Sequence, residues 1–254
     1  MFVHDDFKLT NTFVTIKFVK NMFIPAPENR CNFGHMQRKP ISRRERPAKS
    51  PLSREAVVKA ALTLLKEDGL RKVTMRRIAE VLETGPASLY VYVRDTQDLH
   101  AQLLDALLAE LPTPKPGPNW RADLAHVAEA FLAVLMRYPE IARMTMTNLV
   151  MEPNSIRLLD TIAGLLLAGG ADARAAAWGV DIVLAYVVAT AVEHAGRNND
   201  ADLDSLRQRV ATLDASVHPH LAQLGAELVS GEGLQRFRWG LDVLVNGLLH
   251  GARP

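Results

Sequence analysis

The chain has 254 residues, of which 48% are hydrophobic and 6% aromatic, and its formal net charge is +2. This composition excludes wholesale disorder and, because alanine and leucine are abundant, favours helices over sheets. The single cysteine, Cys31, excludes a disulfide framework and a thiolate zinc site made by this chain alone. The longest apolar run, about residues 182–192, is too short to span a bilayer and is predicted to be a buried helix.

The first 52 residues are predicted to be an extension and a basic arm. Residues 1–35 lack the apolar core and the cleavage site of a secretory signal, and two internal methionines are possible start sites. We expect this stretch to be poorly ordered or untranslated, a short strand-like arm being the alternative. Residues 36–52 are basic and interrupted by prolines. They are either a solvated linker or an arm that lies along DNA phosphates or enters a minor groove, through Arg43 and Arg44.

Apolar residues at helical spacing predict four helices in an N-terminal domain of residues 53–111. Serine and threonine stand where N-caps are expected, glycine stands where the first helix ends, and a proline opens the third helix. The predicted helices are 53–67, capped by Ser53; 75–82, capped by Thr74; 86–91, opened by Pro86; and a leucine-rich helix ending at Leu111, capped by Thr96.

The second and third of these helices are joined by a three-residue turn and so form a compact corner. A major groove is wide enough for one helix, so the third helix can read DNA there; an ordinary hairpin in a helical bundle is the alternative. Small residues at 86–88 allow close approach, and the hydroxyls of Tyr90 and Tyr92 can bond phosphates. Leu89 and Val93 are expected to face inward.

Charge is distributed unevenly along the chain. Residues 36–111 hold 14 lysines and arginines against 10 acids, whereas residues 112–254 hold 12 against 15. A basic front and an acidic rear indicate that the front meets a polyanion.

Four prolines between residues 112 and 118 mark the start of a longer helical part, residues 112–254. No strand is predicted after residue 35, so the predicted fold class is all-α. The helices predicted in this rear part are about 120–137, 140–148, 155–167, 172–194, 202–213, 218–228 and 232–250.

Three segments resemble the N-terminal domain of the tetracycline-repressor (TetR) family: Thr74-Met-Arg-Arg-Ile-Ala-Glu-Val-Leu82, Gly85-Pro-Ala-Ser-Leu-Tyr-Val-Tyr-Val93 and Asp98-Leu99. The resemblance covers about residues 53–111. The rear part is similar to the family's ligand-binding domain, most of all in Trp120 and in Tyr138-Pro139-Glu140. The chain departs from the family at Glu83, Thr84 and Thr96, where many members have glycine, an apolar residue and lysine.

This resemblance implies a three-helix helix-turn-helix domain joined to a larger helical effector-binding and dimerisation domain. It implies a repressor in a bacterial cytoplasm, with double-stranded operator DNA, a small-molecule effector and a second copy of the chain as partners. We expect no membrane partner, metal or cofactor. Glu83 is expected to need a left-handed or strained backbone, or a different turn. Arg94 and the basic arm can compensate for the missing lysine.

Carried over residue by residue, the resemblance assigns DNA contacts to the helix-turn-helix. Thr74 would bond a phosphate at the start of its helix, and Arg76 would reach a guanine edge or a phosphate. Ala87 suits a thymine methyl, and Tyr90 would hold a phosphate unless it is a packed core tyrosine. The predicted DNA-binding residues are Thr74, Arg76, Thr84, Pro86, Ala87, Ser88, Tyr90 and Tyr92, with Arg43 and Arg44 of the basic arm.

The resemblance also implies a dimer through a four-helix bundle, to which each chain gives the helix 172–194 and the final helix. These two helices carry apolar stripes that are either the dimer interface or core within one chain. The stripes are Trp178 and Ile182 in the first helix, and Phe237, Leu241 and Val245 in the second.

The effector pocket suits a largely apolar, aromatic or polycyclic molecule. Its candidate residues, each of which can instead be plain core, are Phe131, Leu135, Met144, Met146, Leu149, Trp178, Tyr186, His126 and His194.

Effector binding is expected to shift the dimer between two states that differ in the spacing of the recognition helices. The fourth helix, residues 97–111, is expected to transmit this change as a lever.

The sequence holds no Gly-rich phosphate loop, His-Glu-x-x-His motif, nucleophile elbow or carboxylate-rich metal motif, so no enzyme activity is predicted. A helical ligand-binding or adaptor protein with a degenerate reading head, and a transcriptional activator, are the alternatives left open.

Overall fold

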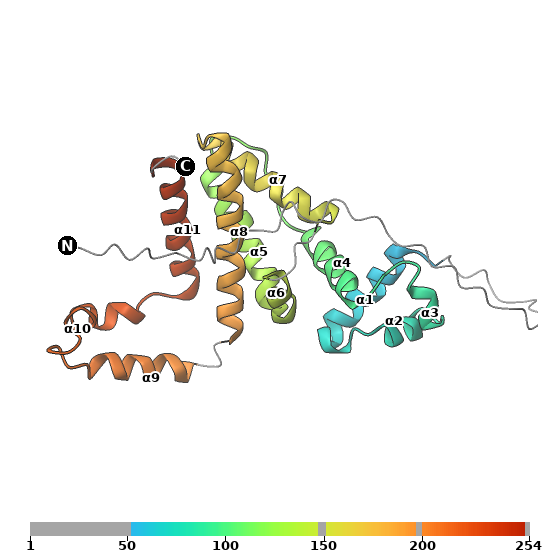
Figure 1. Ribbon diagram of the computed structural model, residues 1–254, viewed down its shortest axis with the longest axis horizontal. Coiled ribbons are helices and arrows are strands. Elements are labelled where there is room, and N and C mark those ends of the chain that lie inside the picture. Colours follow the sequence, from blue (N-terminus) through green and yellow to red (C-terminus); the bar gives the residue numbers. More distant parts are fainter. Residues whose placement is uncertain (1–51, 147–150, 197–199, 252–254) are drawn as a thin grey trace, which may run out of the picture. The chain divides into compact units, whose positions relative to one another are not determined.

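The computed structural model describes residues 52–146, 151–196 and 200–251. Within these ranges the chain consists of α-helices and two short 3-10 helices, with no strand, so the predicted all-α fold class is confirmed (Figure 1). The basic arm with Arg43 and Arg44, and Leu149 among the predicted effector contacts, lie outside the described residues.

The N-terminal part, which we call the reading head, has helices whose starts follow local capping rules. Ser53 accepts a hydrogen bond from the Ala56 amide at 3.2 Å, and Thr74 accepts one from the Arg77 amide at 3.3 Å, so both predicted N-caps are confirmed. The elements are α1 (Arg54–Asp68), η1 (Leu70–Lys72), α2 (Met75–Val81), α3 (Pro86–Leu89) and α4 (Thr96–Leu108).

The start of α4 differs from its prediction by one residue. Thr96 is the first helical residue rather than the cap. The cap is Asp95, which has an extended backbone and whose carboxylate accepts the Asp98 amide at 2.8 Å. A carboxylate at this position also interacts favourably with the partial positive charge of the helix N-terminus.

The rear part continues with seven α-helices and one 3-10 helix within the described residues. The predicted single helix over 218–228 is wrong, because Gly225 adopts a φ of 52° and separates an α-helix from a 3-10 helix. The elements are α5 (Trp120–Arg137), α6 (Pro139–Thr145), α7 (Pro153–Ala168), α8 (Ala173–Gly196), α9 (Asp200–Ala211), α10 (Pro219–Leu224), η2 (Gly225–Val229) and α11 (Gly233–His250).

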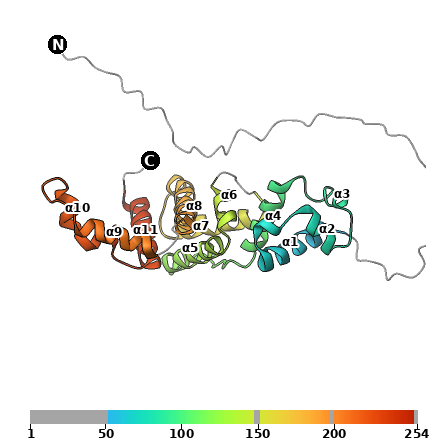
Figure 2. The ribbon, with the colours of Figure 1, turned by 90° about the horizontal axis from the view of Figure 1, so that it is seen from below.

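The central helix of the rear part is α8, which packs against α5, α6, α7 and α11 (Figures 1 and 2). Val183, Val187 and Ala191 of α8 are fully buried among these neighbours. By contrast, α9, α10 and η2 pack mainly on one another. The core of the rear part is therefore built by α5 to α8 and α11.

The length and composition of α8 also suffice to cross a membrane: residues Ala173–Ala195 reach a mean hydropathy of 1.9. The uninterrupted apolar run in the sequence, residues 182–192, is shorter than this helix because it lies between the charged residues Asp181 and Glu193. One such helix is weak evidence for a span, since the core helix of a globular protein has the same properties. Its packing against four other helices favours a core helix.

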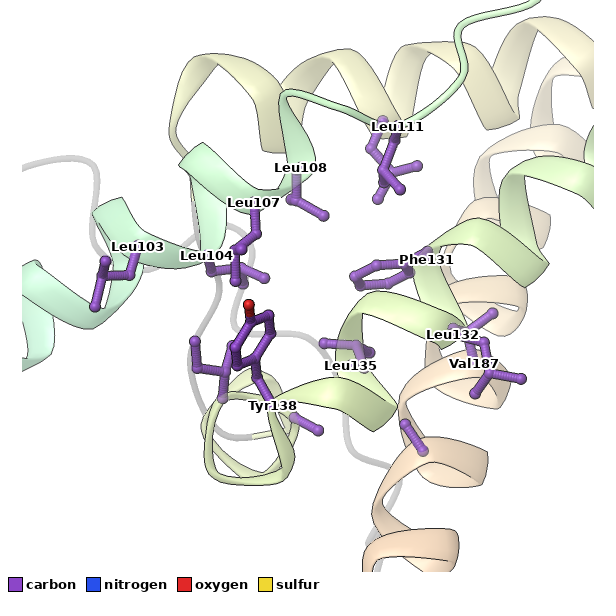
Figure 3. Close-up of a cluster of buried hydrophobic side chains, with 14 of the residues drawn as sticks. Leu103, Leu104, Leu107, Leu108, Leu111, Phe131, Leu132, Leu135, Tyr138 and Val187 are labelled. Atoms are coloured by element: carbon purple, nitrogen blue, oxygen red, sulfur yellow. The ribbon is translucent and has the colours of Figure 1, made fainter. Parts of the chain in front are cut away.

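The helix α4 belongs to both parts of the molecule. It packs against α1 in the reading head and against α5 and α7 in the rear part. Figure 3 shows Leu104, Leu107 and Leu108 of α4, and Leu111 just after its end, on the side of Phe131, Leu135 and Tyr138, with Leu103 nearer the reading head. All of these side chains are buried, so one apolar cluster runs from the head into the rear core.

Candidate functional site

The corner between α2 and α3 is closed by backbone hydrogen bonds. The Thr84 amide donates to the Ala79 carbonyl at 2.9 Å, and the Glu83 amide donates to the Glu80 carbonyl at 3.1 Å. Glu83 has a φ of 47°, so the left-handed conformation expected there is confirmed. The turn leads directly into α3, whose first residue is Pro86.

One face of α3 is buried and the other is open. Leu89 and Val93 are 0% and 1% exposed, as predicted, and anchor the helix in the head. Residues 86–88 are exposed and Tyr90 is 55% exposed, so Tyr90 is not a packed core tyrosine. Val91, which is not among the predicted DNA contacts, is 80% exposed. The open face combines small residues, a hydroxyl and an apolar side chain, which suits contact with a groove.

The second tyrosine, Tyr92, has a different environment from Tyr90. It is half-buried, and its hydroxyl donates to the Leu52 carbonyl at 2.6 Å. A phenol has one proton to donate, so this bond leaves none for a phosphate oxygen. The structure thus gives Tyr92 an anchoring contact with Leu52, the residue before the N-cap of α1, and does not support its predicted contact with DNA.

Two arginines in the first turn of α2 lie beside acids near the surface. The Nε of Arg76 is 3.1 Å from Glu80, and 85% of the Arg76 side chain is exposed; the Nη1 of Arg77 is 2.9 Å from Asp68. Exposed pairs of this type contribute less than about 1 kcal/mol, so Arg76 can exchange Glu80 for a stronger acceptor. Thr74 is exposed next to them.

The loop after α3 is tied to α4 by the buried carboxylate of Asp98. Its Oδ2 accepts the backbone N–H of Arg94 at 2.8 Å. Burial would raise the pKa of Asp98, but the hydrogen bond from the Arg94 backbone and the Arg94 charge outweigh it and hold the pKa below its usual range. Asp98 is therefore ionised at neutral pH and fixes the loop after α3 against α4.

The predicted effector contacts are distributed over several environments. Phe131 and Leu135 are buried in the cluster that α4 and α5 share (Figure 3). Met144 is half-buried, Met146 is 55% exposed, and His126 is exposed on α5. Phe131 and Leu135 are therefore buried close to α4, whereas Met144 packs against the core from its edge.

Two further candidates, Tyr186 and His194, lie where α8 meets α11. The ring of Tyr186 stacks on Phe237 with the centroids 5.2 Å apart, and its hydroxyl donates to the Phe237 carbonyl at 3.2 Å. Burial raises the pKa of this tyrosine. A Cβ at Gly240 would collide with the same hydroxyl, and one at Gly233 would lie 2.9 Å from the ring of His194. Helix packing within one chain accounts for both side chains.

Neither of two hollows on the described part of the chain is lined by a predicted effector contact. One, of about 640 Å³, lies between α9, η2 and the start of α11. The other, of about 460 Å³, is a groove between α5 and α11. Arg238 is bonded to Glu129 beside this groove, at 2.5 and 2.9 Å, and this bonding holds the pKa of Glu129 below its usual range. Among the described residues, no three His, Cys, Asp or Glu side chains are placed to hold a metal ion.

Exposed apolar side chains follow the packed pair α8 and α11. On α8, Trp178 is 56% exposed and Ile182 is 38% exposed; on α11, Trp239 is 71% exposed and Val243 is 49% exposed. We call these four residues the apolar strip. Two exposed tryptophans are unusual on a surface that only meets water, so these two helices carry apolar side chains suited to a partner.

The apolar stripe predicted for the final helix is not part of this strip. Phe237, Leu241 and Val245 are between 1% and 3% exposed and belong to the core of one chain, which was the alternative reading. The sequence pattern does not predict an exposed apolar position at Trp239, because Arg238 and Asp242 near it are charged. Because Phe237, Leu241 and Val245 are buried within the chain, the exposed Trp239 and Val243 form a separate apolar group on α11.

Two family models match the chain. Residues 57–103 match the model of bacterial regulatory proteins of the tetR family. Residues 113–251, more than half of the chain, match the model of the tetracyclin repressor-like C-terminal domain. The two matches correspond to the reading head and to the rear part.

Individual proteins show the same similarity. The tetracycline repressor protein class G of Vibrio anguillarum is 30% identical over 199 residues, which cover 77% of this chain and 93% of that protein. An HTH-type transcriptional regulator of Saccharopolyspora erythraea is 32% identical over 120 residues, so the match spans 47% of this chain and only 51% of that relative. The crystal structure of the Streptomyces coelicolor TetR family protein ActR in complex with actinorhodin has 30% identity and a TM-score of 0.72, covering 81% of this chain and all of that one.

Proposed function

The chain belongs to the tetracycline-repressor family of bacterial regulatory proteins, and from this premise we propose that it is a homodimeric repressor that a small molecule releases from operator DNA. It is a DNA-binding transcriptional regulator with a helix-turn-helix head. The observation that carries the proposal is the open face of α3, where small residues and an exposed tyrosine stand on a helix whose other face is buried.

DNA contacts come from two helices of the head. Residues 86–88 enter the major groove, with Ala87 against a thymine methyl, and Val91 adds a second apolar contact. Arg76 leaves Glu80 for a guanine edge or a phosphate, and Tyr90 holds a phosphate. Thr74, exposed at the start of α2, bonds a further phosphate, and Thr84 lies in the turn between the two helices.

The second copy of the chain docks on the apolar strip. Four side chains on two packed helices give each copy the two-helix face that an isologous four-helix interface needs. Because a symmetric pair reads two half-sites, dimerisation fixes the distance between the two α3 helices. Dimer packing would also cover the exposed length of α8, which supports a cytoplasmic protein without a membrane span.

The effector binds in the rear part, next to the cluster that joins α4 to Phe131 and Leu135. Binding there can act on α4 directly, because α4 carries both this cluster and the core of the reading head (Figure 3). ActR, which is 30% identical, is a family member whose structure holds actinorhodin. The regulatory relatives support a role as a DNA- and effector-binding protein.

A gel-shift titration tests the proposal, with DNA from upstream of the protein's own gene and an excess of random competitor at fixed salt. Arg76→Ala removes a predicted base contact. Arg207→Ala is its matched control, because Arg207 also forms an exposed ion pair within one helix, with Asp204 at 2.7 Å on α9. A discrete shift that is kept in the control and weakened in Arg76→Ala is expected. A shift that random competitor abolishes would contradict sequence-specific reading.

A further inference from the structure

The first turn of α7 is capped by a side chain from another helix. Its own N-cap residue, Glu152, makes no side-chain capping bond, and its first residue is Pro153. Instead, Oδ1 of Asp105 on α4 accepts the Ser155 amide at 2.8 Å and the Ser155 hydroxyl at 3.2 Å, and Oδ2 accepts the side-chain amide of Asn154 at 2.8 Å. Asp105 and Ser155 are 8% and 7% exposed, so these bonds are shielded from water.

The last turn of α4 is capped in return by a side chain of α7. The Nη2 of Arg157 donates to the carbonyls of Leu108 and Ala109, both at 3.1 Å. Terminal carbonyls of a helix have no partner within the helix, and a cation is favoured beside them as an anion is favoured beside N-terminal amides. An acid of α4 and a base of α7 thus each complete the other's helix end.

We propose that this reciprocal cap, made by Asp105, Ser155 and Arg157, sets the orientation of the reading head on the rear part. It makes these three residues positioning residues for DNA reading, an assignment that rests on the proposed repressor function. The leucine cluster around α4 also joins head to rear, but apolar packing is non-directional and tolerates sliding or rotation. The caps are directional hydrogen bonds at two points on one helix, and two such points fix its direction.

Two consequences follow for DNA binding. Operator half-sites require a fixed distance between two α3 helices, and in each chain α4 links α3 to the dimer-forming part. Loss of the reciprocal cap therefore leaves each head folded but variable in orientation. An effector that moved α7 against α4 would act on the same bonds, so the cap is also where binding in the rear part can reach the head.

The orientation is measured directly by pulsed electron spin resonance on the full-length protein without DNA. Spin labels at Val81→Cys on α2 and Leu167→Cys on α7, both at exposed positions, report the distance from head to rear part. Cys31→Ser removes the native thiol, and dilution with unlabelled protein ensures that the measured distance joins two labels of the same chain.

Asp105→Asn and Arg157→Gln break the reciprocal cap from the α4 side and from the α7 side. Arg238→Gln breaks the ion pair between α11 and α5 as a charge-matched control.

The cap variants are expected to broaden the distance distribution and to add a second distance, while the control keeps the narrow one. Their operator affinity is expected to fall about tenfold, as for loss of a buried charge-assisted hydrogen bond. Ser155→Ala, which removes only a hydroxyl, is expected to give a smaller broadening and keeps the test valid if Asp105→Asn does not fold. An unchanged distribution in folded Arg157→Gln and Ser155→Ala would overturn the proposal. Absence of operator binding by the unchanged protein would count against the repressor function alone, because the distance is read without DNA.

Discussion

The reading head and the rear part place their functional residues in opposite ways. In the head, the contacts that begin the helices are local: Thr74 caps α2, which bears Arg76, and Asp95 caps α4. In the rear part, the decisive contacts join residues far apart in the chain, such as Tyr186 with Phe237 and Asp105 with Ser155. DNA reading thus depends on a small, self-contained unit, whereas its control depends on how distant helices are packed.

The largest expected effects on stability come from truncating one core leucine in the reading head and one in the rear part. Comparing the two variants shows whether the head and the rear part fail independently. Leu89 and Leu165 are both 0% exposed, one in the head and one in α7. Leu89→Ala should destabilise the head by about 2–5 kcal/mol and abolish operator binding while the chain still dimerises. Leu165→Ala should destabilise the rear part and lower both dimerisation and operator binding. Thermal unfolding, sedimentation and gel shift on both variants check this, and loss of dimerisation in Leu89→Ala would break the comparison.

The apolar strip is tested by placing a charge at its most exposed tryptophan. Trp239→Glu is expected to weaken the dimer by about 2–4 kcal/mol, the usual cost of losing a central tryptophan at an interface. The measurement is sedimentation equilibrium over a range of concentrations. Met136→Glu on α5, also an exposed apolar position, is the control and should leave association unchanged. Equal association of both variants would place the dimer interface elsewhere.

Within the head, base and phosphate contacts should respond differently to mutation. Arg76→Ala is expected to cost about 1–3 kcal/mol on the operator and much less on random DNA, because it removes a base contact. Tyr90→Phe should cost about 1 kcal/mol on both, because a hydroxyl on a phosphate carries no sequence information. Fluorescence anisotropy with both DNAs measures the four affinities. An equal loss for Arg76→Ala on the two DNAs would assign that arginine to the backbone.

The smallest expected effect concerns the turn between α2 and α3. Glu83 holds a φ of 47°, which costs an ordinary residue about 1 kcal/mol and glycine almost nothing. Glu83→Gly should therefore raise the melting temperature by a few degrees and leave operator affinity nearly unchanged. A lower melting temperature would show that the side chain of Glu83 contributes more than its backbone conformation costs.

The difference between the two parts also explains how much could be predicted from the sequence. Helix positions, the inward-facing Leu89 and Val93, and the unusual backbone at Glu83 follow from spacing, capping and turn chemistry, all of which act over a few residues. The cap of α4 was displaced by one residue because Asp95 and Thr96 are both good caps. Tyr92 was assigned to DNA because the sequence does not show that Leu52 lies beside its hydroxyl.

In the rear part, side-chain type alone was a poor guide to position. Tyr186 has the chemistry of an effector contact, yet stacking on Phe237 engages it within the chain. Trp239 interrupts a charged stretch and showed no pattern, yet it is the most exposed residue of the apolar strip. The bonds of Asp105 to the start of α7 span about fifty residues, and no local rule connects those positions. Tertiary packing decides which of several apolar faces is left open.

Hydroxyl-radical footprinting of the protein on its upstream DNA tests the central claim most directly. A symmetric pair of reading heads should protect two stretches related by two-fold symmetry, with centres about one helical turn, or a whole number of turns, apart. Mutation of either protected half-site should weaken the shift, and Arg76→Ala should weaken the protection of both. A single unpaired footprint, or protection that moves freely along the DNA, would contradict a dimer that reads its operator through α3.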